Sequence, residues 1–216
     1  MSRIDRVAVA CAVVAASVAA ACGGPQRGGA RCGRAAVIGD EAELTEVAMC
    51  SSVGDLVIRT GAHIDLTRWT ELDHVTGAIS IGPTSAIEQL VIPNLRAIDG
   101  AVRISANLSL REIALPALER ATAITIEANP ELATVALPTL RQIGLLHVID
   151  DPDLALLDLG SLARVEGELR LDTVPSLSSL EAPKLERIGD LHVVRATKLP
   201  DDIAQRLRAA AAHDGP

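Results

Sequence analysis

Basic and imidazole side chains recur at one or two times an interval of 22 or 23 residues between positions 103 and 192. The spacings between these side chains are 44, 23 and 22 residues. Two carboxylates belong to the same pattern, because each follows a position of the repeat, 125 or 170, by two residues. The set comprises Arg103, His147, Arg170 and His192, with Glu127 and Asp172 as the carboxylates. Arginine and imidazolium groups bind anions, and neighbouring carboxylates can act as general acid and base. Three interpretations follow, in falling order of preference: a water-facing structural surface, a ligand-binding face, and a catalytic site.

An aliphatic repeat must position these side chains. The first apolar residue of each strand-like stretch recurs every 22 or 23 residues, at Leu56, Ile79, Val102, Ile124, Leu146, Leu169 and Leu191. Aliphatic residues also stand two, eight and sixteen residues after each of these positions, through all seven repeats. Such a pattern is typical of a solenoid, whose units bury their apolar faces by stacking. We expect Leu132 and Leu140 to point inward and Arg141 to point outward.

The repeat is predicted to consist of strands, not helices. Apolar and polar residues alternate at its start, and a proline that would break a helix recurs fourteen residues in, at Pro93, Pro116, Pro138 and Pro183. Short polar residues that favour turns follow the first strand in successive repeats, at Asn107, Asn129 and Asp151. We predict that these three residues stack as a ladder. Asn107 also begins Asn-Leu-Ser, which matches an N-glycosylation sequon, but we interpret this asparagine as structural. The expected fold is all-β: a parallel β-solenoid of about seven coils over residues 56–199.

In this register the basic series forms one outward column on one sheet, with Glu168 and Asp190 beside it. His147 and His192 then stand two coils apart, roughly 9–10 Å at the usual strand spacing. Zinc ligands lie about 2 Å from the metal, so these two side chains cannot share one ion without backbone movement. No metal site, cofactor or catalytic residue is predicted. Trp69, the single tryptophan, is expected to plug the loop of the first coil.

Helical caps are expected at both ends, because an open solenoid end exposes core and unpaired strand edges. The N-terminal cap would cover residues 37–55, with a short helix in the segment 41–50. The C-terminal cap would cover residues 200–216, with Asp201 behind Pro200 as the candidate N-cap of an alanine-rich helix.

Residues 1–21 have the features of a signal peptide. Arg3 and Arg6 precede an apolar run that is too short for a comfortable membrane span of roughly 20 residues. The run ends in Val-Ala-Ala-Ala-Cys-Gly-Gly, which resembles the lipobox of bacterial lipoproteins, although Ala19 stands where Leu is most frequent. The resemblance implies that Cys22 is lipidated and anchors the protein to a membrane, facing the periplasm or the cell surface. Ordinary cleavage after an Ala-x-Ala site, giving a secreted protein, is the alternative.

If the cell has two membranes, Gly23 after the lipid-bearing cysteine mildly favours the outer one. Export would leave a net charge of −9 with histidine neutral. Such a surface repels phosphate backbones, and the chain contains no Phe or Tyr on which bases could stack. Nucleic acid is therefore not an expected partner.

Two cysteines remain once Cys11 is assigned to the signal peptide and Cys22 to the lipobox. Cys32 and Cys50 form an even pair in an oxidising compartment, where a disulfide is the default expectation. The segment 22–36 is rich in glycine and polar, and is interpreted as a flexible tether.

Residues 49–58, Met-Cys-Ser-Ser-Val-Gly-Asp-Leu-Val-Ile, place a cysteine four positions before Gly-Asp-Leu-x-Ile at the first strand. With the upstream cysteine and the repeat length, this resembles the receptor L-domain family, known from insulin and epidermal growth factor receptors and from bacterial surface proteins. The resemblance covers about residues 32–207. It implies a right-handed, leucine-rich-repeat-like β-helix, a disulfide between Cys32 and Cys50, and ligand binding without catalysis. Relatives often carry another cysteine near the last coil; none stands there in this chain, so its C-terminal cap would hold by packing alone.

The expected function is that of a lipid-anchored extracytoplasmic binding module that recognises a protein or glycan on a surface. Its ligand face would comprise Arg103, Glu127, His147, Arg170, Asp172 and His192. Two alternatives stay open: a structural surface protein without a dedicated ligand, and a carbohydrate-active β-helix enzyme.

Overall fold

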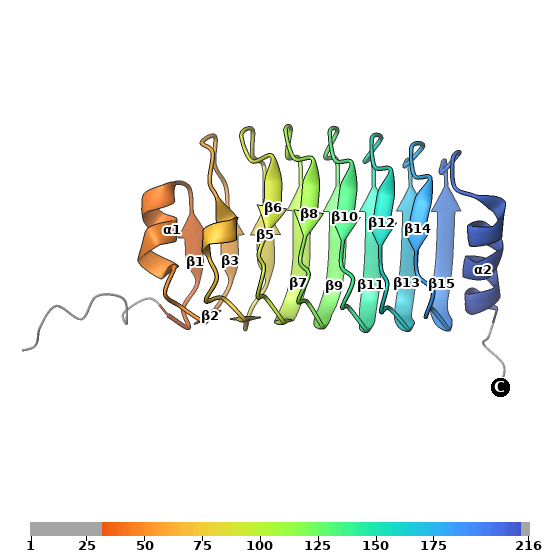
Figure 1. Ribbon diagram of the computed structural model, residues 1–216, viewed down its shortest axis with the longest axis horizontal. Helices are drawn as coiled ribbons and strands as arrows, with labels where there is room; N and C mark the ends of the chain where they lie inside the picture. Colours follow the sequence, from red (N-terminus) through yellow and green to blue (C-terminus); the bar gives the residue numbers. More distant parts are fainter. Residues whose placement is uncertain (1–31, 213–216) are drawn as a thin grey trace, which may run out of the picture.

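A computed structural model describes residues 32–212 of the chain. Parallel strands wind into a β-solenoid of about seven coils, with one helix at each end of the rod (Figure 1). The fold class predicted from the repeat is thus confirmed. The expected signal peptide, the lipidation site Cys22 and the first part of the tether lie outside the described residues, as does His213.

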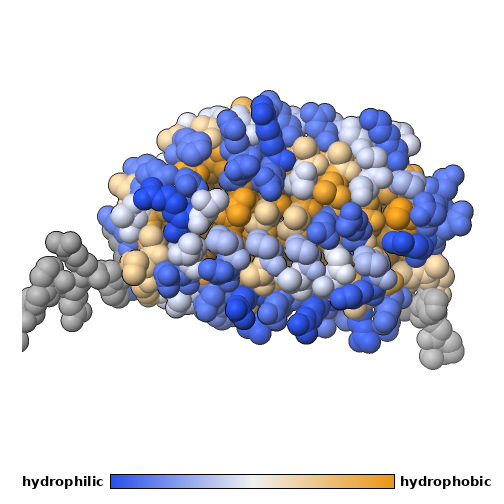
Figure 2. Space-filling view, viewed as in Figure 1, coloured by the Kyte–Doolittle hydropathy of each residue, from blue (hydrophilic) through white to orange (hydrophobic). Residues whose placement is uncertain are grey.

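The strands form two parallel sheets. The long sheet consists of β1 (Ala36–Ile38), β3 (Leu56–Ile58), β5 (Ile79–Ile81), β7 (Ala97–Ser105), β9 (Arg120–Glu127), β11 (Gln142–Ile149), β13 (Arg164–Asp172) and β15 (Arg187–Val194), joined at its side by β2 (Ser52–Val53) and β4 (His74–Val75). The short sheet consists of β6 (Gln89–Val91), β8 (Glu112–Ala114), β10 (Thr134–Ala136), β12 (Leu156–Asp158) and β14 (Ser179–Glu181). Seen from one face, the hydrophobic residues gather in a band along the rod, between hydrophilic borders (Figure 2).

The pairing register confirms the aliphatic repeat. Each first inward residue pairs with its counterpart in the next coil, from Leu56 with Ile79 through to Leu169 with Leu191. Leu132 and Leu140 are fully buried, as expected. The last coil departs from the pattern: Val193 is 37% exposed, because no further coil stacks on it.

A second column, of glycines, lies where the backbones of successive coils approach each other closely. Two residues before the first inward position stands a glycine in six of the seven coils: Gly54, Gly77, Gly100, Gly144, Gly167 and Gly189. A Cβ atom at Gly100 would lie 2.6 Å from the Gly77 carbonyl oxygen, too close for any side chain. One coil carries Thr122 there instead, and its hydroxyl donates to the Asp99 carbonyl at 2.7 Å.

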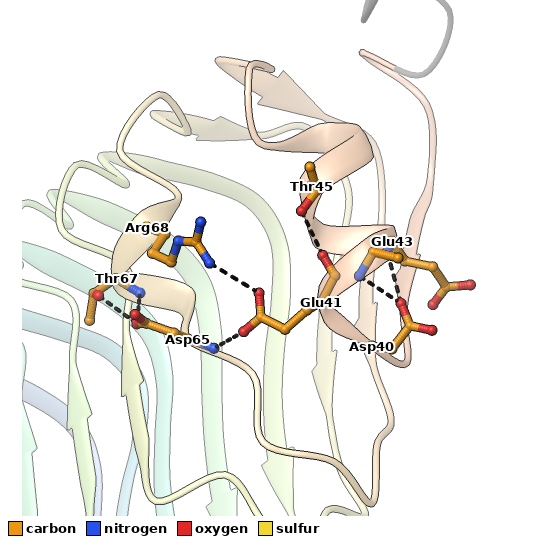
Figure 3. A network of polar contacts seen from close by, with 8 residues as sticks. Asp40, Glu41, Glu43, Thr45, Asp65, Thr67 and Arg68 are labelled. Atoms are coloured by element: carbon orange, nitrogen blue, oxygen red, sulfur yellow. Dashed lines mark hydrogen bonds and ion pairs between the residues drawn. The ribbon is translucent and has the colours of Figure 1, made fainter.

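The N-terminal cap is the helix α1 (Glu41–Val47), which begins after Asp40. The Asp40 carboxylate accepts hydrogen bonds from the backbone N–H groups of Ala42 and Glu43, each at 2.9 Å. Glu41 connects this helix to the first coil, since its carboxylate accepts from the Asp65 N–H at 2.7 Å and lies 3.7 Å from Arg68 (Figure 3). Leu44 and Val47 are the buried residues of the helix.

Cys32 and Cys50 form a disulfide with a Cα–Cα distance of 5.2 Å, which confirms the expected pairing. Trp69, which ends the short 3-10 helix η1 (Leu66–Arg68), is fully buried and donates its indole N–H to the Cys50 carbonyl at 3.2 Å. Its interpretation as a plug is therefore also confirmed. The sheet begins at Ala36, so the segment expected to be tether ends in strand β1, and the expected N-terminal cap contains the rest of β1 together with α1 and β2.

The C-terminal cap is the helix α2 (Asp201–Ala211), which buries Leu207 and Ala210 against the last coil. The prediction that Asp201 is its N-cap is wrong. Pro200 holds that position with an extended backbone, and Asp201 and Asp202 instead lie in the first turn, where carboxylates favour the helix dipole. Within residues 32–212, no helix is long and apolar enough to cross a membrane.

Candidate functional site

Strands β11, β13 and β15 bring the predicted outward column together in space. His147 pairs with Arg170, and Arg170 pairs with His192, so the three side chains stand on adjacent strands of the long sheet. Arg103 belongs to the same column, but Thr125 separates it from His147. The column thus divides into a contiguous part at the C-terminal end and one arginine further along the rod.

Asp172 lies at the centre of the contiguous part. Its carboxylate accepts hydrogen bonds from the guanidinium of Arg195 at 2.8 Å and from that of Arg170 at 3.0 Å. The side chain is only 11% exposed. These hydrogen bonds, first that of Arg195 and then that of Arg170, lower the pKa of Asp172 to about 2. Asp172 is therefore a permanent anion that holds two arginines in place.

Arg195 was missed by the sequence analysis. It follows β15 at a corner where the backbone has a positive φ of 53°, outside the alternation that identifies outward strand positions. The same corner position holds Ala106, Ala128, Asp150 and Thr173 in the preceding coils, all with positive φ. Comparison of corner residues across coils could have found it, since only the last of them is basic.

His147 and Arg170 each have a polar atom that is shielded from solvent without a hydrogen bond. The Nε2 atom of His147 lies 2.8 Å from Glu168 Oε2, an ion-pair contact without hydrogen-bond geometry. The Nε atom of Arg170 has no hydrogen-bond partner within residues 32–212. Glu168 pairs in register with Asp190, which places a second carboxylate beside the histidine column. We call this group the outward cluster; it comprises His147, Glu168, Arg170, Asp172, Asp190, His192 and Arg195.

Arg103 and Glu127 form a separate pair on β7 and β9. The Arg103 guanidinium donates to the Glu127 carboxylate at 2.7 Å, and the two side chains are 59% and 36% exposed. The structure thus leaves these two predicted face residues apart from the outward cluster.

The predicted ladder of turn residues is present in the interior. The side-chain amide of Asn107 donates to Asn129 Oδ1 at 2.8 Å, and that of Asn129 donates to Asp151 Oδ1 at 3.0 Å. Thr84 begins the ladder by donating its hydroxyl to Asn107 Oδ1 at 2.8 Å. Since Asn107 is fully buried in this ladder, the structural interpretation of its sequon is confirmed.

The ladder ends at Asp151, because Val174 occupies the next position in the stack. Asp151 is fully buried, and its Oδ2 atom has no hydrogen-bond partner in the described part of the chain. Burial raises the pKa of Asp151 to about 7, against the opposing effect of the hydrogen bonds from Asn129. Its fully buried position keeps this carboxyl away from any substrate on the surface.

Within residues 32–212, no group of three or more His, Cys, Asp and Glu side chains is arranged to hold a metal ion. His147 and His192 are two coils apart in the sheet register, with Arg170 between them. The cluster presents cations and anions in alternation, an arrangement suited to hydrogen bonding and charge pairing with a ligand.

Comparison with known proteins gives no relative. No protein-family model matches the chain, and neither a curated protein nor a solved structure matches it. The resemblance to the receptor L-domain family stays a prediction, and what the protein does must be argued from its own geometry.

Proposed function

We propose that the protein is a lipid-anchored, extracytoplasmic binding module, and that the outward cluster on β11, β13 and β15 contacts its ligand. The ligand is a protein or glycan at a surface that presents carboxylate or carbonyl oxygens. Such groups accept hydrogen bonds from arginine and from protonated histidine.

The observation that carries this proposal is Arg170 Nε, a donor on the outward column that has no hydrogen-bond partner within residues 32–212. On the adjacent strand, His147 Nε2 lies 2.8 Å from Glu168 Oε2. A buried polar atom without a partner costs about 1–3 kcal/mol. A ligand oxygen that reaches the Arg170 guanidinium would satisfy this donor.

The carboxylates support binding over catalysis. A general acid at neutral pH needs a raised pKa and access to the substrate. Asp172 has a pKa of about 2 and is itself nearly buried, and Asp151 has a pKa of about 7 but is fully buried. Neither residue combines the two requirements of a carbohydrate-cleaving enzyme.

Export is supported by the Cys32–Cys50 disulfide, since such bonds persist in oxidising compartments. Acylation of Cys22 with two or more chains would give stable membrane residence, which a single chain would not. Intact-mass analysis of the mature protein tests the anchor. An unmodified N-terminal Cys22, or a mature chain that starts elsewhere, would rule it out.

The binding face is tested with a photo-crosslinking residue at Thr125, on β9 between Arg103 and His147, in cells displaying the protein. A crosslinker at Thr134, on the outward face of the short sheet, is the matched control. We expect a discrete crosslinked partner from position 125 and none from position 134. Equal labelling from both sites would mean that the outward cluster is not the contact face.

The role of the unbonded donor is tested by Arg170→Lys, which keeps the charge but removes the Nε donor and the planar fork. We expect at least tenfold weaker binding of the crosslinked partner, with the melting temperature nearly unchanged. Arg103→Lys, in the separate exposed pair, is the control and should bind as the wild type does. If Arg170→Lys binds with unchanged affinity, the proposed contact is wrong.

A further inference from the structure

The short sheet ends one strand before the long sheet does. Each of the coils that contain β6 to β12 is followed by another short strand, but after β15 the chain enters helix α2. In Figure 1, α2 stands beside β15, the last strand of the long sheet. β14 is therefore the edge of the short sheet, and its outer side faces the helix.

A series of backbone hydrogen bonds shows which groups this edge leaves unpaired. Leu115, Leu137 and Leu159 each donate their N–H to a carbonyl of the following coil, at 3.1, 2.8 and 2.8 Å. Ala182 is the next member of the series. No following strand accepts its N–H, and no other acceptor for it exists within residues 32–212. The alternating geometry of a parallel sheet turns the N–H and C=O of Leu180 to the same outer side.

A groove lies against this edge. The inward column that carries Ile92, Leu115, Leu137 and Leu159 shrinks to Ala182 in the last coil, which leaves space beside it. A hollow of about 600 Å³ lies between Ala182 and α2, with Leu185, Leu207 and Ala210 on its walls. A second hollow of about 410 Å³ follows β14 from Ser178 to Pro183 and reaches Ile203. Both hollows include Ala182, Pro183 and Arg206, so together they run the length of the edge.

We propose that this groove is a docking site for an extended segment of a partner polypeptide, which adds to β14 as a sixth strand of the short sheet. Its carbonyl groups accept from the Ala182 N–H, and its N–H and C=O groups pair with Leu180. Backbone pairing of this kind gives affinity, and alternate side chains give specificity. A helix would not serve, because its backbone groups are already paired within it.

The walls define the segment's side chains. Those that point inward must be small and apolar, to fit over Ala182 beside Leu207. Glu181, Glu186 and Asp202 line the two hollows, against Arg206 as their one basic residue. Side chains that point outward should therefore be basic. A second copy of this chain fits poorly, because its β14 edge carries the same acidic residues.

Panning a random linear octapeptide library against the full chain tests the site. We expect enriched peptides in which apolar and basic residues alternate. Binding should protect the backbone amides of Leu180 and Ala182 from hydrogen exchange at least tenfold, as measured by NMR. A peptide with N-methyl groups on its pairing amides should bind at least tenfold more weakly.

Ala182→Leu restores the side-chain size of the preceding coils and should weaken peptide binding at least tenfold. Ala114→Leu, on the outward face of β8, is the matched control and should bind normally. Asp202→Lys, on the exposed first turn of α2, gives a second variant that should fold and should weaken basic peptides. The proposal is overturned if no peptide is enriched, or if enriched peptides bind Ala182→Leu unchanged. Concentration-dependent dimerisation with protection of the same amides would overturn it as well, by showing that a second copy takes the edge.

Discussion

Asp151 and Asp172 stand on successive coils in opposite environments. Asp151 is enclosed at the end of the interior ladder, where Asn129 donates to one carboxylate oxygen and nothing in the described chain donates to the other. Asp172 lies in the outward cluster, where both oxygens accept from arginines. Burial raises the pKa of Asp151 to about 7, whereas hydrogen bonds from Arg195 and Arg170 lower that of Asp172 to about 2.

The difference separates two ways in which a solenoid satisfies its polar groups. Each residue of the interior ladder is hydrogen-bonded to a residue of a neighbouring coil, so a substitution in one coil leaves a polar group of its neighbour unpaired. The outward cluster depends on charged groups at the surface, and in the proposed function some of their partners are exchanged for a ligand. Stability should therefore respond mainly to the ladder and binding mainly to the cluster.

Asn129→Ala should produce the largest loss of stability. It removes the acceptor of the Asn107 amide at 2.8 Å and the donor to Asp151, and it leaves buried groups unpaired on both neighbouring coils. At about 1–3 kcal/mol for each unsatisfied group, the free energy of unfolding should fall by about 3–5 kcal/mol. Urea denaturation followed by circular dichroism measures it. Thr134→Ala, on the outward face, should change it by less than about 0.5 kcal/mol; similar losses in the two variants would mean that the ladder contributes nothing particular.

Asp151→Asn should have the opposite effect and raise the free energy of unfolding. An asparagine there supplies the donor that the carboxylate lacks, in the manner of Asn129. Because the pKa of Asp151 is raised on folding, its contribution to stability is complete below about pH 4 and is lost as pH rises through about 7. The variant should thus be more stable than wild type at pH 8, by on the order of 2–4 kcal/mol, and much closer to it at pH 4.

Unfolding measured in urea at several pH values checks this. Between pH 4 and 7 the free energy of unfolding of the wild type should fall as pH rises, by an amount that Asp151→Asn does not show. Glu127 and Asp150, which also disfavour the anion at 151, remain in both proteins, so the difference isolates residue 151. A variant that is equally destabilised at both pH values would refute this account.

The interior could largely be predicted from the sequence, because stacking forces like residues into columns. Asn107, Asn129 and Asp151 share one column and could be interpreted together without coordinates. The glycine column at Gly77 and Gly100 follows the same rule, because a Cβ atom there would collide with the neighbouring coil.

The outward cluster was predicted only in part. Strand alternation placed His147, Arg170 and His192 correctly, yet it said nothing of Arg195, whose backbone turns at a corner. It also could not show that Arg170 would pair with Asp172, since both residues project from one strand and long side chains choose among several partners. The sequence predicted Asp201 as the N-cap because aspartate is favoured at that position. The N-cap is Pro200, one residue earlier.

Direct titration sharpens the comparison between the two carboxyls. Side-chain carboxyl chemical shifts followed by ¹³C NMR should give a midpoint near 7 for Asp151 and near 2 for Asp172. Because the pKa of Asp172 is lowered on folding, its contribution to stability is present above about pH 4 and is lost as pH falls through about 2. Arg195→Gln should move the midpoint of Asp172 upward and leave that of Asp151 unchanged. Overlapping midpoints in the wild type would erase the distinction between the two sites.

The smallest effect is expected for the exposed pair of Arg103 and Glu127. Their 2.7 Å contact is among the shorter ion pairs on this face, but both side chains are largely hydrated. Exposed pairs typically contribute about 0.2–1 kcal/mol, because solvent and salt screen the attraction. A double-mutant cycle with Arg103→Ala and Glu127→Ala should give a coupling below about 0.5 kcal/mol that vanishes in molar salt. A coupling as large as the Asn129→Ala loss would mean that outward charges also hold the coils together, and the division between the stabilising interior and the binding surface would fail.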